Sequence, residues 1–165
     1  MISTGMQAAL NTQVKYEIES AYLYLAMSAY CENINLPGMA AWLRVQWQEE
    51  LAHAMKLFQY MNERDGRILL EAISKPPSDY DSPSAIFTQV LAHEKKVTAA
   101  INALYDVAIK EKDLPTQIEL QWFVKEQVEE EKSAQDILNM IQIAGESGVS
   151  LLMLDRQLGQ RAAGK

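Results

Sequence analysis

Six polar residues recur at matched intervals along the chain. They are Glu17, Glu50, His53, Glu94, Gln127 and Glu130. In the first half, Glu50 and His53 follow Glu17 by 33 and 36 residues. In the second half, Gln127 and Glu130 follow Glu94 by the same 33 and 36 residues. These intervals predict a duplicated helical hairpin whose two halves place their polar groups at one level of a bundle.

Each of these residues lies on a stripe of apolar residues that repeats every three to four positions, the spacing of a helix face that packs in a bundle core. The four glutamates are therefore expected to be buried together. An internal ion-pair network would need cations, but no Lys or Arg occupies the stripes. Four protonated glutamates in a plain structural bundle are the other alternative, and burial makes that arrangement costly.

Metal ions explain a cluster of buried glutamates better than an ion-pair network or four protonated glutamates do. Two divalent ions supply four positive charges against the four carboxylates. A carboxylate-rich site with one imidazole suits a hard or borderline metal with open positions, above all iron that reacts with oxygen. Zinc prefers more nitrogen or sulfur ligands, and calcium prefers oxygens from a loop. The pattern therefore predicts a di-iron centre inside the bundle.

Long helices must position these groups. Apolar periodicity and turn signals predict helices over residues 5–33, 38–65, 83–113 and 115–145, and a short fifth helix over 150–160. Gly66 is the predicted stop of the second helix, and Ser82 and Pro83 are the predicted start of the third. The 17 residues from 66 to 82 reach roughly 56 Å when extended, and a 28-residue helix is about 42 Å long. The sequence thus predicts an all-α four-helix bundle with one long crossover and a short fifth C-terminal helix.

Composition excludes several classes of function. The chain of 165 residues is 48% hydrophobic, which predicts one domain over residues 1–165 with a sizeable core. Its net charge of −7 disfavours nucleic-acid binding. The single cysteine, Cys31, excludes an intrachain disulfide and a Cys-rich zinc site. No secretory signal and no apolar run of about 18 residues is visible, so we expect a cytoplasmic protein without a membrane partner.

Two segments indicate an oligomer. The crossover is rich in apolar residues, namely Ile68, Leu69, Leu70 and Ile73. They could pack on their own bundle, but so apolar an edge segment is more typical of a contact with another subunit. The fifth helix is too short to be stable alone and needs a surface to pack on.

The sequence resembles the ferritins, specifically the haem-free bacterial ferritins, over nearly its whole length. The segment Glu50-Leu51-Ala52-His53 matches the Glu-x-x-His motif of the family's second helix. On the fourth helix, Gln127-Val128-Glu129-Glu130 stands where di-iron oxygenases, reductases and bacterioferritins carry a second Glu-x-x-His. Ferritins share that departure, and the resemblance implies a weaker second iron site from which iron moves on to storage.

The resemblance also implies a role for each matching residue. The first iron would be bound by Glu17, Glu50 and His53. Glu50 would bridge to a second iron held with Glu94 and Glu130. Two further family positions lie beside this centre, a glutamine that matches Gln127 and a tyrosine that matches Tyr24, the latter proposed to donate a hydrogen bond or an electron.

A third iron site is implied as well. Its ligands would be Glu49, Glu126 and Glu129, and Glu130 would link it to the second iron. Glu126, Glu129 and Glu130 share one helix face, which fits the role, although a solvated acidic face explains the first two almost as well. Leu51 stands where bacterioferritin carries its haem-binding methionine, so no haem is expected. His93 precedes Glu94 but lies off the inward stripe, and we interpret it as a structural or surface histidine.

The implied function is iron storage with ferroxidase activity. Fe(II) would be oxidised by O2 or H2O2 at the di-iron centre and stored as a ferric mineral inside a hollow homo-oligomer of 24 subunits. The alternative enzyme is a di-iron oxidase or oxygenase acting on an organic substrate, which predicts the missing second Glu-x-x-His. Another alternative, a DNA-protecting mini-ferritin, has its metal site between subunits and lacks the fifth helix.

Overall fold

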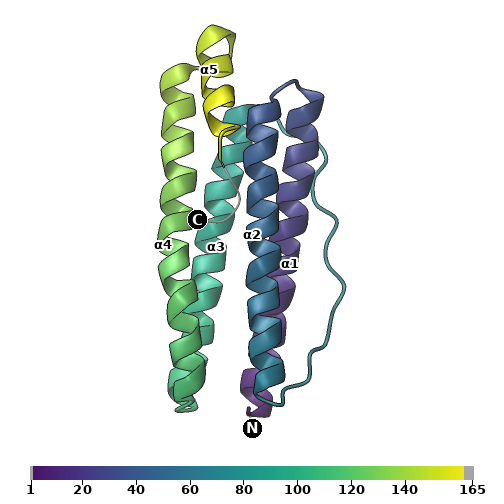
Figure 1. The fold of residues 1–165 in the computed structure, drawn as a ribbon, viewed down its shortest axis with the longest axis vertical. Coiled ribbons are helices and arrows are strands. Elements are labelled where there is room, and N and C mark those ends of the chain that lie inside the picture. The colour runs from purple at the N-terminus through teal and green to yellow at the C-terminus, as the bar shows by residue number, and fades with distance from the viewer. Residues whose placement is uncertain (1, 162–165) are drawn as a thin grey trace.

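The computed structural model describes residues 2–161. Across these residues the chain forms helices and no strand: α1 (Thr4–Asn33), α2 (Pro37–Glu63), α3 (Pro83–Lys110), α4 (Leu114–Ala144) and α5 (Gly148–Leu158). Figure 1 shows two antiparallel hairpins, α1–α2 and α3–α4, side by side, with the crossover running along the outside of the first hairpin. The short α5 lies at one end of the bundle. The predicted all-α architecture is confirmed.

Three helices end in the same kind of turn, in which a residue other than glycine adopts the left-handed conformation. These residues are Asn35, Asp65 and Lys112, with φ of 61°, 55° and 56°. The next residue along the chain donates its N–H to a carbonyl of the last helical turn, and Gly66 donates to Met61 in this way at 2.8 Å. The second helix therefore ends at Glu63 and not at residue 65, because Asp65 makes the turn one residue before the predicted stop at Gly66.

The same kind of turn shortens the third helix relative to its predicted range. It ends at Lys110 and not at residue 113, since the chain reverses at Lys112. Asp113 belongs instead to the start of α4, where its side chain accepts the N–H of Thr116 at 3.3 Å. Ser82 starts α3 as predicted and accepts the N–H of Ala85 at 3.1 Å.

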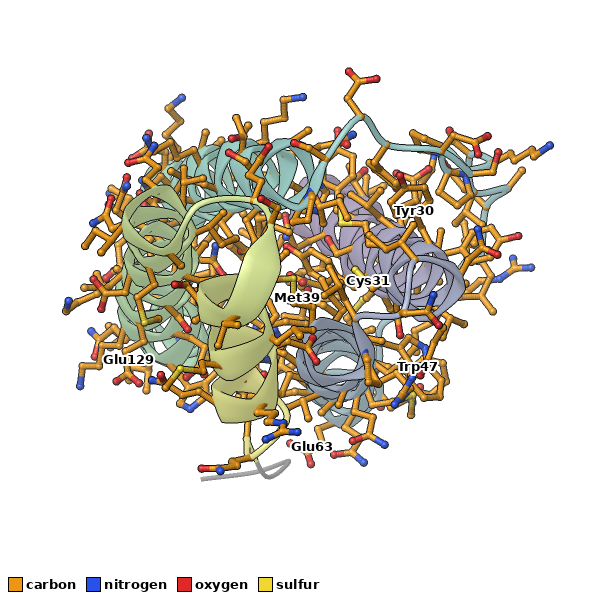
Figure 2. All side chains as sticks on the ribbon, turned by 90° about the horizontal axis from the view of Figure 1, so that it is seen from above. Tyr30, Cys31, Met39, Trp47, Glu63 and Glu129 are labelled. Atoms are coloured by element: carbon orange, nitrogen blue, oxygen red, sulfur yellow. The ribbon has the colours of Figure 1, made fainter. Side chains whose placement is uncertain are left out.

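The core consists of two apolar clusters with a polar layer between them. The cluster nearer α5 contains Tyr24, Leu43, Leu91 and Ala134, and the cluster at the other end contains Val14, Leu57, Val97 and Phe123. On every long helix the polar stripe residues fall between a member of one cluster and a member of the other. Figure 2 looks along the bundle and shows Cys31 and Met39 among the helices, with Glu129 at the outer edge of α4. The site therefore interrupts the core at mid-height.

Helix α5 is fastened to the start of α2. Leu36 at the N-cap of α2 makes no side-chain cap, and Asp155 of α5 takes that role. Its carboxylate accepts the N–H of Gly38 at 3.1 Å and of Met39 at 2.8 Å. Gly38 is required for this approach, because a Cβ there would lie 1.7 Å from the carbonyl oxygen of Asp155.

Side chains of α1 fasten the crossover. Asn11 donates to the carbonyl of Arg67 at 3.0 Å and accepts the N–H of Leu69 at 2.8 Å. Glu19 accepts the N–H of Ser74 at 3.0 Å. The crossover is thus held by its backbone, and its apolar side chains Leu69, Leu70 and Ile73 remain exposed.

Within residues 2–161, no helix is both long enough and apolar enough to cross a membrane.

Candidate metal centre

The polar layer collects side chains from all four long helices. Glu17 comes from α1, Glu50 and His53 from α2, Glu94 from α3, and Gln127 and Glu130 from α4; each is at most 5% exposed. Their burial confirms the inward stripes inferred from the sequence. Helical spacing explains the placement, because positions three and four apart lie on one face.

The first hairpin supplies a ready set of metal ligands. Glu17, Glu50 and His53 each offer one ligand atom, and these atoms all lie within 4.8 Å of one another. One oxygen of each glutamate, Glu17 Oε2 and Glu50 Oε2, is buried without a hydrogen-bond partner among the described residues. Such unpartnered buried oxygens are costly and fit a site that receives a cation.

A second group joins the same histidine to the fourth helix. Ligand atoms of His53, Glu126 and Glu130 also lie within 4.8 Å of one another. The resemblance to ferritins assigns Glu94 and Glu130 to the second iron and Glu126 to the third, and these assignments stay predictions. The ligand atoms of the described residues bring Glu126 close to His53 and Glu130. Glu126 lies one helical turn before Glu130 on the same face, which explains its approach to His53.

Glu94 belongs to neither group of ligand atoms among the described residues. Both of its oxygens accept hydrogen bonds: the Tyr24 hydroxyl donates to Oε1, and Gln127 Nε2 donates to Oε2 at 3.2 Å. Gln127 also donates to the backbone carbonyl of Glu94 at 3.3 Å. The tyrosine and the glutamine that the sequence analysis singled out are therefore the two groups that orient this carboxylate.

Burial shifts the protonation of the whole layer. Burial raises the pKa of Glu17 to about 7 and that of Glu130 to about 8, and it raises the pKa of Glu50 and Glu94 as well. Burial also lowers the pKa of His53 to about 4. The imidazole is consequently neutral at pH 7, as a metal ligand must be, and an arriving cation displaces protons from the carboxyls.

Two glutamines beside the centre were not among the predicted site residues. Gln13 donates to Glu17 Oε1 at 2.8 Å, and Gln46 donates to Glu130 Oε2 at 2.9 Å. Gln13 lies four residues before Glu17, and Gln46 lies four residues before Glu50. Their position one helical turn before a candidate ligand is the signal that could have identified them.

The residues proposed for a third iron line a cavity next to the centre. Glu49, Glu126, Glu129 and Glu130 face a space of about 420 Å³. Glu129 is exposed, whereas Glu49 and Glu126 are partly buried. Arg161, which follows α5, also lines this cavity. Arg161 was not among the predicted site residues, because it lies outside the stripes of the four long helices.

His93 lies outside both ligand groups among the described residues, in agreement with a structural role. Its Nε2 is 2.7 Å from the hydroxyl oxygen of Ser20, and its ring packs edge-on against Tyr24 with centroids 5.8 Å apart. It therefore helps to hold Tyr24 in the position from which that residue reaches Glu94.

A buried site of glutamates and one neutral imidazole, built across four antiparallel helices, is typical of carboxylate-bridged metalloproteins of the helical-bundle type. Comparison with known proteins gives the family. The family model described as Ferritin-like domain matches residues 7–144. The chain belongs to the ferritin family.

Relatives and solved structures agree with this assignment. The bacterial non-heme ferritin of Bacteroides fragilis (strain 638R) is 42% identical over 161 residues, which are 98% of this chain and 100% of that protein. The bacterial non-heme ferritin of Escherichia coli O6:H1 is 36% identical and covers 96% of each chain. The open-pore ferritin of the hyperthermophilic archaeon Archaeoglobus fulgidus is 51% identical, with a TM-score of 0.97 over 98% of this chain and all of that one. These findings support an iron-storage ferritin and do not favour an oxidase acting on an organic substrate.

Proposed function

We propose that the chain oxidises Fe(II) to Fe(III) with O2 or H2O2 at a di-iron centre within each subunit and stores the product as a ferric oxo-hydroxide mineral. The observation that carries this proposal is the pair of unpartnered buried oxygens on Glu17 and Glu50 beside the neutral His53. Two Fe(II) ions supply four positive charges to a layer of four buried glutamates.

The first Fe(II) would be held by Glu17, Glu50 and His53. Glu50 would bridge to the second Fe(II), which Glu130 and Glu94 would complete. The approach of Glu126 to His53 and Glu130 supports Glu126 as a further ligand near the second ion. Each Fe(II) gives up one electron to the oxidant, and the added positive charge is offset by oxygen anions from the oxidant or water.

The other residues of the layer would orient these ligands. Tyr24 and Gln127 both donate to Glu94, so the second ion has to compete for a carboxylate that is already hydrogen-bonded. Through its contact with Glu94, Tyr24 would also be placed to supply an electron to the centre. Glu49, Glu126 and Glu129 would bind a third iron on the way to the mineral, with Glu130 as the link.

We further propose one domain over residues 1–165 and a cytoplasmic homo-oligomer of 24 subunits that encloses the mineral. Three exposed apolar surfaces support assembly. Tyr22 and Leu25 lie on α1, Leu69 and Leu70 on the crossover, and Val149, Leu152 and Met153 on α5. Surfaces of this kind are typical of subunit contacts.

The ferroxidase proposal is tested by following Fe(III) formation after Fe(II) is added aerobically to the assembled protein. Glu50→Ala and His53→Ala are expected to remove the fast oxidation that precedes mineral growth. Glu63→Ala is the matched control, because Glu63 is an exposed glutamate on the same helix. The proposal is wrong if both site variants oxidise the first two Fe(II) per subunit as fast as the control.

A further inference from the structure

The cavity beside the di-iron centre contains a cation of the chain itself. Arg161 Nη2 lies 2.6 Å from Glu49 Oε2, and Arg161 Nη1 donates to Gln46 Oε1. The guanidinium also packs over the ring of Trp42, with 4.6 Å between Cζ and the ring centroid. Three different contacts therefore hold this side chain at the mouth of an acidic cavity.

Arg161 is also linked through Gln46 to Glu130, a candidate ligand of the second iron. Gln46 accepts from Arg161 with its oxygen and donates with its Nε2 to Glu130 Oε2 at 2.9 Å. The glutamine amide is thereby oriented, since the arginine has no acceptor and the carboxylate has no N–H. A movement of Arg161 would release Gln46, and with it one of the contacts that fixes Glu130.

The charges in the cavity make Arg161 and a metal ion competitors. Burial raises the pKa of Glu49 and Glu126, and the nearby Arg161 acts against this rise at Glu49. A divalent ion bound to Glu49 would lie within a few Å of the guanidinium, where two positive charges repel strongly in a partly buried site. Filling the cavity with a metal ion therefore requires the Arg161–Glu49 ion pair to open.

We propose that Arg161 is the competing cation of the third iron site, so that its guanidinium and a metal ion occupy Glu49 in turn. Arg161 then sets how tightly the third ion binds, and binding of that ion loosens Gln46 and the segment of residues 159–161. This inference rests on the third site in the proposed function. It goes beyond it by assigning a regulatory residue that is not itself a ligand.

The test is a calorimetric titration of the assembled protein with Zn(II), a redox-inert probe, under conditions in which two tighter ions fill first. Arg161→Gln, which loses the charge, is expected to bind the third Zn(II) about fivefold more tightly than the unmodified chain. Arg161→Lys keeps the charge and is expected to stay near the unmodified affinity. Arg156→Gln is the matched control, because Arg156 is an exposed arginine on α5.

A second readout follows the segment directly. Hydrogen exchange of the amides of Gln160 and Arg161, which bond to Gln157 and Leu158, is expected to accelerate when the third Zn(II) binds. An unchanged or weaker third affinity in Arg161→Gln overturns the inference, and so does unchanged exchange.

Glu129→Ala separates the two possible failures. Loss of the third Zn(II) in this variant supports the third site. If Arg161→Gln then binds the third Zn(II) with the affinity of the unmodified chain, only the role of Arg161 is overturned. A third ion that is absent from the unmodified chain, or one that Glu129→Ala retains, overturns the third site and the inference together. The two tighter ions, and with them the ferroxidase proposal, are unaffected by either result.

Discussion

The two hairpins have the same polar spacing but present their ligands differently. In α1–α2, Glu17 and Glu50 each keep one buried oxygen without a partner beside His53. In α3–α4, both Glu94 oxygens accept hydrogen bonds, and Glu130 Oε2 accepts one from Gln46. A metal ion gives the two unpartnered oxygens of the first hairpin a partner, although Glu17 Oε1 already accepts from Gln13. To bind Glu94 it must displace existing hydrogen bonds. We therefore expect a metal ion to bind more tightly at the first hairpin than at the second.

Such a difference would suit the proposed function. An ion held mainly by the first hairpin would stay long enough to react, and an ion held by the second would leave. Glu130 occupies the position of the second half that matches His53 of the first half. The second hairpin therefore has no imidazole at this level, which is consistent with weaker metal binding.

The largest expected effect comes from removing a ligand of the first hairpin. His53→Ala is predicted to weaken the first Fe(II) or Zn(II) by more than about 100-fold, since loss of even an outer-shell partner of a metal ligand costs 10- to 100-fold. Glu94→Ala is predicted to weaken that first ion by less than about tenfold. Anaerobic titration calorimetry on the two variants makes the comparison. Equal losses in both variants would remove the distinction between the hairpins.

A smaller effect is expected from making the second hairpin resemble the first. The double variant Gln127→Glu, Glu130→His recreates a Glu-x-x-His motif on α4. It is predicted to hold the second ion about tenfold more tightly, because an imidazole replaces a carboxylate that is already hydrogen-bonded. Less iron should then move from each centre to the mineral. The amount of ferric mineral formed per subunit after repeated Fe(II) additions measures this decrease. A second ion that binds no more tightly would contradict this reading of the asymmetry.

The pH dependence of stability comes next. Glu17 has an ordinary pKa of 4.5 and a folded value of about 7. Its folded form therefore binds protons more strongly than its unfolded form, and the stability this provides is complete below about pH 4.5 and lost as pH rises through about 7. Without added metal, the free energy of unfolding should fall by about 1 to 3 kcal/mol over this range on account of Glu17.

Chemical denaturation between pH 5 and 8.5 measures this fall, compared in the unmodified chain and Glu17→Gln. The variant should show a smaller decline, because its neutral amide does not titrate. Added Zn(II) should reverse the trend, since the ion competes with protons and binds better as pH rises. An unmodified, metal-free protein that loses no more stability between pH 5 and 8.5 than Glu17→Gln would contradict the pKa assignment.

The smallest effect is expected at the N-terminus of α2, which is capped differently from the N-termini of the other three long helices. Helices α1, α3 and α4 carry their own side-chain caps, whereas α2 is capped by Asp155 from α5. Asp155→Ala is predicted to lower the free energy of unfolding by about 1 kcal/mol, the usual cost of a lost cap. Asp106→Ala, at an exposed position on α3, is the control. Thermal unfolding that does not distinguish the two variants would show that α5 docks by its apolar face alone.

The sequence predicted the polar layer because helical spacing and the repeated intervals of 33 and 36 residues leave little freedom in where Glu17, Glu50, Glu94 and Glu130 can lie. It predicted the ends of α2 and α3 less well. There, Asp65 and Lys112 adopt the left-handed conformation that glycine usually provides, so their residue types gave no signal. These errors do not displace the site, since the helix faces keep their register.

The details of ligand geometry could not be predicted in the same way. The approach of Glu126 to His53 depends on how α2 and α4 pack, which spacing along one helix does not specify. The side chain of Arg161 contacts residues of α2 that are more than 100 positions away in sequence, and Asp155 anchors α5 to the start of the same helix. Contacts between distant segments of this kind require the structure.

Storage at a di-iron centre is tested most directly by measuring particle mass and iron together. The assembled protein is analysed by size-exclusion chromatography with light scattering, before and after aerobic addition of about ten Fe(II) per subunit. A particle of roughly 450 kDa, as expected for 24 chains of 18.6 kDa, that keeps all the added iron soluble as Fe(III) is the predicted result. A small oligomer that retains only two iron ions per chain and lets the remainder precipitate would contradict it.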